Sequence, residues 1–197
     1  MRLRSLVVAT HPTVEPVSLA AAKAHLGLLP EQEDDHAQIL AMIATARRLV
    51  EKRLGVALVP QQLRARFDHS DGDGWSRGPA GIGPITLRLP VTPILVGNAY
   101  PVAVDVDGVA VSSSTYSVDA DGGYLRFSTA PSVSELATLT VTYWAGQEIL
   151  SPQLRSAILL YVGHLYLNRE ASAAGAVADV PLAFETLLAS ESVTGRW

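Results

Sequence analysis

The side chains best suited to chemistry in this chain are the carboxylates of a glycine-rich stretch, DHSDGDG, at residues 68–74. Asp68, Asp71 and Asp73 offer the hard oxygen ligands that calcium prefers. Their spacing differs from the calcium-loop pattern D-x-D-x-D-G, and no glutamate stands where that pattern needs a bidentate ligand. The stretch therefore predicts a solvated loop, and we expect neither a metal site nor a cofactor.

The histidines and nucleophiles form no catalytic pattern that we recognise. No two histidines have the spacing that holds zinc from one helix; they stand at positions 11, 25, 36, 69 and 164. His164 lies inside an apolar stretch, so we interpret it as a hydrogen-bonded core residue. The chain has no cysteine, no P-loop lysine motif and no dinucleotide-binding glycine pattern. We therefore expect that the protein is not an enzyme.

Charged residues gather at the two ends of a helix predicted over residues 35–54. An acidic group precedes the helix and a basic group occupies its second half. The acidic members are Glu31, Glu33, Asp34 and Asp35, and the basic members are Arg47, Arg48, Lys52 and Arg53. Such charges complement the helix dipole, which explains them as a solvated face. As a hypothesis for assembly, Arg47 and Arg48 of one subunit pair with Glu33 and Asp34 of a neighbour.

The composition is that of a soluble globular protein of 197 residues, with 48% hydrophobic and 17% charged residues. The net charge of −4 argues against nucleic-acid binding as the main task, because such proteins usually carry a basic footprint. The N-terminal stretch MRLRSLVVATHP lacks the apolar length and the cleavage site of a signal peptide. We expect no association with a membrane.

The order of predicted elements is helix, helix, strands, helix, helix. Residues 18–27 and 35–54 have helical periodicity, short strands with glycine turns follow up to residue 146, and helices return at Pro152 and Pro181. The sequence thus predicts an α+β fold, in which a small bundle of about four helices carries an inserted antiparallel β-sandwich or barrel-like module. The predicted boundaries are 1–56 and 147–189 for the helical core, 57–146 for the β module and 190–197 for a C-terminal tail.

The helix predicted at residues 152–170, PQLRSAILLYVGHLYLNRE, is apolar on nearly every face. A helix of this kind must be covered nearly all round, and a small domain supplies few neighbours. We therefore predict that Ile158, Tyr161 and Leu165 contribute to a subunit interface. The apolar run is shorter than the roughly 20 residues that span a bilayer, so it is a core helix.

Several stretches in fixed order resemble a known family. They are PVSLAAAKAHLG (16–27), LPVTP (89–93), VTYWAG (141–146), the helix at 152–170 with its YLNRE end, and PLAFETLL (181–188). This order resembles the head–tail connector, or adaptor, family of tailed bacteriophages, in the variety that carries a β module between its helices. The resemblance covers most of the chain. Phages, prophages and phage-like gene transfer agents all contain such proteins.

The resemblance implies a structural role in a virion or phage-like particle. Members of the family form a homo-oligomeric ring, usually a dodecamer, beneath the portal protein. They join the portal to stopper or tail-tube proteins at the head–tail junction, and double-stranded DNA passes through the channel without sequence-specific binding. Assembly in the bacterial cytoplasm is implied as well.

The polar C-terminal segment SESVTGRW is the predicted portal contact. Tryptophan and arginine are typical hot-spot residues of interfaces, and in view of the family's role we predict that this tail becomes ordered on binding the portal. The residues concerned are Ser190, Glu191, Val193, Arg196 and Trp197.

A binding module is the alternative interpretation. The β module would then recognise carbohydrate or a host surface from its helical base. Its aromatic platform would consist of Tyr100, Tyr116, Tyr124 and Trp144, although their alternate strand positions favour a place in the core.

Overall fold

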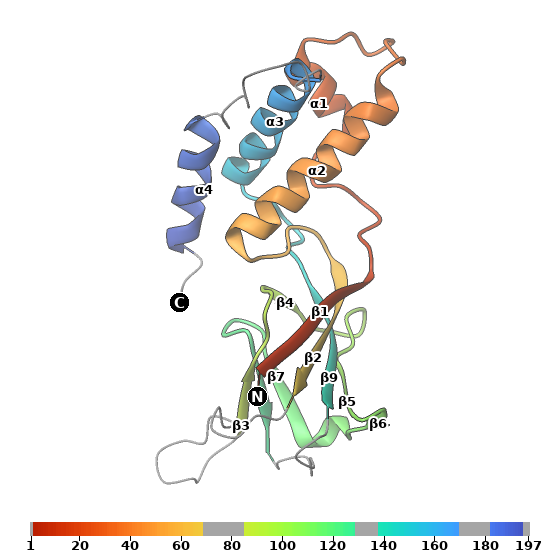
Figure 1. Ribbon diagram of the computed structural model, residues 1–197, viewed down its shortest axis with the longest axis vertical. Helices are drawn as coiled ribbons and strands as arrows, with labels where there is room; N and C mark the ends of the chain where they lie inside the picture. Colours follow the sequence, from red (N-terminus) through yellow and green to blue (C-terminus); the bar gives the residue numbers. More distant parts are fainter. Residues whose placement is uncertain (1, 69–84, 129–137, 170–181, 195–197) are drawn as a thin grey trace. The chain divides into compact units, whose positions relative to one another are not determined.

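The computed structural model describes residues 2–68, 85–128, 138–169 and 182–194 (Figure 1). Residues 85 and 192–194 are described by their backbone only. The chain divides into two compact units. One unit, the β unit, consists of Met1–Pro12 and Gly55–Glu148, and the other, the helical unit, consists of Thr13–Leu54 and Ile149–Trp197. Each unit is therefore built from two separate stretches of sequence.

The helical unit contains the four predicted helices. They are α1 (Leu19–Leu26), α2 (His36–Leu54), α3 (Pro152–Leu167) and α4 (Leu182–Thr194). The side chain of Ser18 caps α1 by accepting a hydrogen bond from the backbone N–H of Ala21 at 3.2 Å, and Gly27 ends the helix with a φ of 70°. Ser151 caps α3 in the same way, and Pro152 occupies its first turn.

The core of the helical unit lies around α3, which packs against α1, α2 and α4. Its members are buried aliphatic residues and one phenylalanine: Ala22, Ile39, Ile43, Ala46, Val50, Leu154, Ala157, Ile158, Val162, Phe184 and Leu188. Ile158 is completely buried within its own chain. It therefore has no surface to offer to a neighbouring subunit, because the three other helices already cover the face of α3 on which it lies.

The β unit contains nine strands in two antiparallel sheets among the described residues. The strands are β1 (Arg2–Thr10), β2 (Gln61–Asp68), β3 (Ile85–Arg88), β4 (Ile94–Leu95), β5 (Ala103–Val106), β6 (Val109–Ala110), β7 (Tyr116–Asp119), β8 (Tyr124–Phe127) and β9 (Thr138–Ala145). The larger sheet has the order β1-β2-β9-β5-β6, with β4 also paired to β9, and the smaller sheet has the order β3-β8-β7.

Alternation of side chains explains how the two sheets share one core. In β2, Leu63, Ala65 and Phe67 are buried while Arg64 and Arg66 are exposed, as expected for a strand with one covered face. Strands of both sheets contribute to a single cluster of buried residues. The predicted α+β fold is thus confirmed, and the β unit is an open two-sheet arrangement rather than a closed barrel.

Two boundaries differ from the predicted ones. Residues 2–10 form β1 and pair with β2, so they belong to the β unit and not to the helical core. The partner strand lies more than fifty residues away, which is why a local pattern cannot reveal this pairing. At the other end, α4 continues to Thr194, so that residues 190–194 are helical. None of the described helices combines the length and the apolarity needed to cross a membrane.

Candidate functional site

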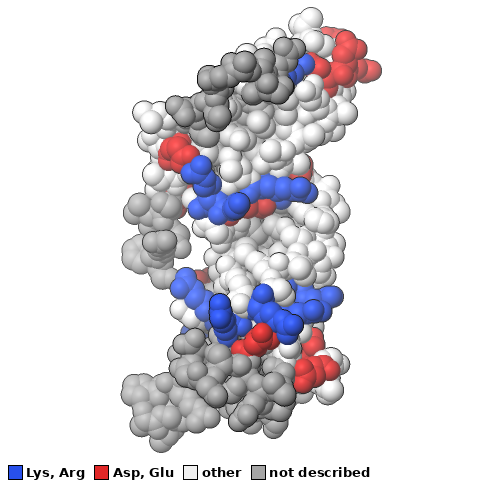
Figure 2. Space-filling view, viewed as in Figure 1, with Lys and Arg blue, Asp and Glu red and all other residues white. Residues whose placement is uncertain are grey.

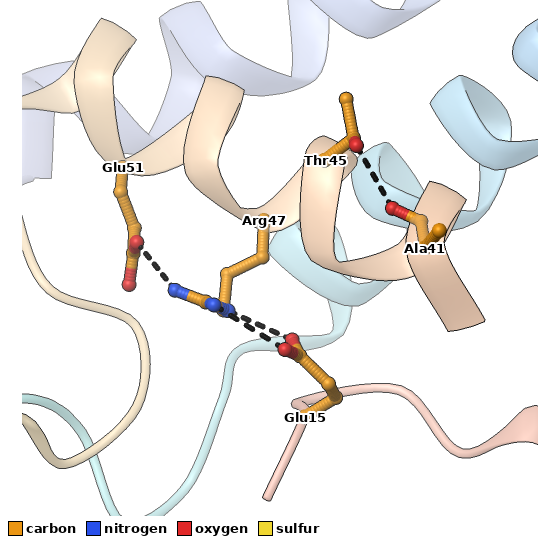
Figure 3. A network of polar contacts seen from close by, with 5 residues as sticks. All are labelled: Glu15, Ala41, Thr45, Arg47 and Glu51. Carbon is orange, nitrogen blue, oxygen red and sulfur yellow. Dashed lines mark hydrogen bonds and ion pairs between the residues drawn. The ribbon is translucent and has the colours of Figure 1, made fainter. Parts of the chain in front are cut away.

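Arg47 of α2 is a buried cation with two carboxylate partners in its own chain (Figure 3). Its Nε and Nη2 atoms donate to Glu15 at 2.7 and 3.2 Å, and its Nη1 atom donates to Glu51 at 2.8 Å. Burial lowers the pKa of Arg47, but the two carboxylates outweigh that effect and the pKa lies above its usual value. The network fastens the segment before α1 to the middle of α2.

The structure therefore changes which basic residues can take part in the predicted contact between subunits. Arg47 needs no carboxylate from a neighbour, since Glu15 and Glu51 occupy its guanidinium. Arg53 contacts Glu185 of α4 at 3.0 Å. Arg48 and Lys52 remain exposed on α2.

Only some of the carboxylates at the acidic end of the helical unit are exposed to solvent. Glu31, Glu33 and Asp34 are exposed in the loop before α2. Figure 2 shows acidic side chains at one end of this unit and basic side chains farther along it. The geometry thus retains Arg48, Glu33 and Asp34 as candidates for contacts between subunits.

Asp35 is held by residues from the end of α3. The hydroxyl of Tyr166 donates to Asp35 at 2.7 Å, and the guanidinium of Arg169 donates to the same carboxylate at 3.2 and 3.3 Å. Arg169 also stacks 3.7 Å from the centre of the Tyr166 ring. The hydrogen bond from Tyr166 lowers the pKa of Asp35, and the same bond raises the pKa of Tyr166. This cluster joins the start of α2 to the end of α3.

A small apolar cavity of about 220 Å³ lies beside α1 and contains a buried cation that we did not predict. Lys23 is 4% exposed; its ammonium donates to the carbonyl of Pro30 at 2.6 Å and lies 2.7 Å from Nε2 of His36. The sequence did offer one signal for this buried cation, namely a single lysine among the alanines and leucines of α1. Lys23 holds the loop between α1 and α2 against α1.

The remaining predicted interface residues of α3 are only half-buried. Tyr161 packs against Phe184 with ring centres 5.2 Å apart, and its ring lies 5.9 Å from that of His164. Leu165 is half-buried, whereas Leu167 at the end of the helix is 83% exposed. Tyr161 and Leu165 therefore keep part of their surface available for a neighbour.

The predicted portal contact begins inside α4. The hydroxyl of Ser190 donates to the Leu187 carbonyl at 2.7 Å, and Glu191 accepts a hydrogen bond from Ser151 at 2.9 Å. Val193 lies on the same helix. Arg196 and Trp197 fall outside the described residues.

The aromatic residues of the β unit do not form one exposed platform. Tyr116 packs against the core, 6.0 Å from the ring of Phe127, and its hydroxyl donates to the Val102 carbonyl at 2.9 Å. Tyr100 pairs separately with Trp144 at 5.7 Å. The geometry therefore gives no support to a carbohydrate-binding surface built from these side chains.

No described group of three His, Cys, Asp or Glu side chains is arranged to hold a metal ion. Asp71 and Asp73 lie outside the described residues. So does GWSRG at residues 74–78, which has the G-x-S-x-G spacing of a hydrolase nucleophile; the expectation that the sequence contains no such motif was therefore wrong. In the α/β-hydrolases this motif forms a turn between a strand of the sheet and a helix. The strands described here pair antiparallel instead.

Comparison with known proteins finds the same fold in chains of gene transfer agent particles. No protein-family model matches the chain, and neither does any curated protein sequence. Solved structures do match over nearly the whole chain, among them three from gene transfer agent particles. One is a chain of the virion of a native gene transfer agent particle, with 19% identity, a TM-score of 0.68, and coverage of 94% of this chain and 93% of that one.

The two other structures are necks of gene transfer agent particles. A chain from the neck of the empty particle, computed with C6 symmetry, has 19% identity, a TM-score of 0.69 and 94% coverage of each chain. A chain from the neck of the native particle, computed with C12 symmetry, has 20% identity, a TM-score of 0.61, and coverage of 95% of this chain and 94% of that one. This chain therefore shares the fold of these chains, which is consistent with the sequence resemblance to head–tail connectors.

Proposed function

We propose that this protein is a head–tail connector of a phage-like particle. It forms a ring beneath the portal and joins the portal to the stopper or tail tube. Double-stranded DNA passes through the channel of the ring, and the role is structural rather than enzymatic. The site of action is the neck of the particle.

The observation that carries this proposal is the extent of the structural likeness. The match to the neck chains covers 94% of this chain and 94% of the neck chain, so it includes the helical unit and the β unit together. A shared helical bundle alone would be weak support, because many unrelated functions use such bundles. The C6 and C12 symmetries named for those necks support a ring.

Contacts between copies within the ring are proposed to use the charges of α2. Exposed Glu33 and Asp34 precede the helix and exposed Arg48 lies in its second half, so two different patches of the unit complement each other. Such a heterologous, head-to-tail contact generates a closed ring when its rotation closes. Half-buried Tyr161 and Leu165 would add apolar area. A substitution Arg48→Glu is expected to weaken ring formation without lowering the melting temperature.

The portal is proposed to bind the end of α4 and the residues that follow it. Ser190, Glu191 and Val193 lie on the last turns of the helix, and Arg196 and Trp197 supply the side-chain types that dominate interface energies. Deletion of residues 195–197 should weaken binding to the portal and leave the described part of the fold intact.

Light scattering after size-exclusion chromatography tests the function directly. The purified protein is run alone and after mixing with the portal protein encoded beside it. Co-elution in a complex larger than the portal alone is the expected result. A protein that remains monomeric and elutes apart from the portal would refute the connector function.

A further inference from the structure

The outer strand of the larger sheet, β1, is exceptionally exposed. It lies at one end of the strand order, and among the described residues only β2 pairs with it. Eight of its nine residues are exposed and the ninth is half-buried. An edge strand presents a row of unpaired backbone N–H and C=O groups, which is a template for another strand.

The side chains of β1 do little to block such pairing. Soluble proteins usually protect an edge with charges, proline or a short strand. Here the charges stop at Arg4, and the centre of the strand is the apolar sequence Leu6, Val7, Val8. Leu6 lies opposite buried Ala65, and Val7 lies opposite exposed Arg64. Apolar side chains are therefore exposed on both faces of the edge.

The opposite edge of the same sheet is a short apolar segment. It consists of β6, in which Val109 is 72% exposed and Ala110 is also exposed. The backbone N–H of Val111 donates to the Val104 carbonyl at 2.9 Å, which extends the pairing by one residue. The β6 edge is thus three residues long, which is the same length as the apolar segment Leu6–Val8 of β1.

The two edges differ in the charged residues near them. Arg2 and Arg4 belong to β1, and the nearest carboxylate to Arg4 is that of Asp68, in an ion pair of 3.4 Å between exposed side chains. Asp105 and Asp107 belong to the β5–β6 hairpin. Each uses its Oδ1 atom to accept a backbone hydrogen bond, from Gly108 at 3.2 Å and from Thr138 at 2.9 Å. Asp107 therefore faces β9, on the side of the hairpin away from the β6 edge, and the edge residues Val109–Val111 carry no charge.

We propose that β1 of one copy pairs with β6 of the next copy, so that the larger sheets continue from subunit to subunit. The proposal rests on the ring of the proposed function. In this pairing Leu6–Val8 lies alongside Val109–Val111, with Val7 opposite Ala110. Because two different edges meet, the contact is heterologous, as a ring requires.

Cysteine cross-linking tests this pairing without interference, since the chain has no cysteine of its own. Neighbouring strands lie about 4.8 Å apart, within the Cα separation of about 4.4–6.8 Å that a disulfide spans. The test variant combines Val7→Cys with Ala110→Cys. Its matched control combines Val7→Cys with Val96→Cys, because Val96 is an exposed valine of the same unit.

Oxidation of the assembled test variant should give a ladder of covalent multimers on a non-reducing gel, and the control should give none. Rings that form with the portal and yield no ladder, or an equal ladder in the control, would overturn the strand pairing and leave the connector function standing. Failure of the wild-type chain to join the portal would instead refute the connector function itself, and this proposal with it.

Discussion

Replacement of Arg47 by methionine should destabilise the helical unit strongly. The substitution keeps most of the aliphatic stem and removes three hydrogen bonds to carboxylates. It takes the Arg47 guanidinium away from Glu51, whose side chain is 13% exposed, and from Glu15, whose side chain is 26% exposed. Removal of one partner from a buried ion pair costs about 3–5 kcal/mol.

The expected loss lies at the lower end of that range, about 3 kcal/mol, because Glu15 retains contact with water. In a chain of this size each kcal/mol lowers the melting temperature by about 2–4 °C. The Arg47→Met variant should therefore melt about 6–12 °C below the wild type, as measured by the loss of helical circular dichroism.

Arg48→Met is the matched control for this measurement. Arg48 is the next residue on the same helix and is exposed, so its replacement should change stability by no more than about 0.5 kcal/mol. Arg47→Lys should fall between the two, because an ammonium cannot reproduce the two-pronged contact with Glu15. If the Arg47 and Arg48 variants proved equally stable, the network would have no role in holding the unit together.

Three further predictions concern single sites. Tyr166→Phe should destabilise the protein at neutral pH, and the difference should shrink as the pH falls below about 4, because the pKa of Asp35 is lowered in the folded state and its stabilising charge is lost on protonation; an unchanged difference in acid unfolding curves would contradict this. Phe184→Ala should cost about 3–5 kcal/mol in urea denaturation, since this ring is completely buried. Gly146→Ala should reduce the yield of folded protein, because a methyl group there would lie 2.5 Å from the Val59 carbonyl; normal yield and melting temperature would refute that reasoning.

The helices could be predicted because their signals are local. Ser18, Gly27 and Ser151 cap helices within three residues of their own positions, so spacing along the chain is enough to find them. The pairing of β1 with β2 depends instead on a contact between residues 2–10 and 61–68. Nothing in either segment alone specifies its partner, so the predicted boundaries placed residues 2–10 with the helical core and not in the sheet.

The candidate site shows the same limit at the level of two neighbouring residues. Arg47 and Arg48 are chemically identical and adjacent, yet one is buried in a network and the other is exposed. The available signal was periodic, because Arg47 lies four residues after core residue Ile43 and four residues before Glu51. Its second partner, Glu15, comes from a segment without regular structure. That contact requires the folded chain.

The discontinuity of the two units has a consequence for synthesis on the ribosome. The first strand is made at the outset, but β2 begins at Gln61 and β9 ends at Ala145. At about 5–20 residues per second, the apolar edge of β1 waits roughly 3–10 seconds for its first partner and longer for a complete sheet. The helical unit is completed later still, since α3 and α4 follow β9. The core of the β unit can therefore close only once Glu148 has emerged, and that of the helical unit only after α4 has followed.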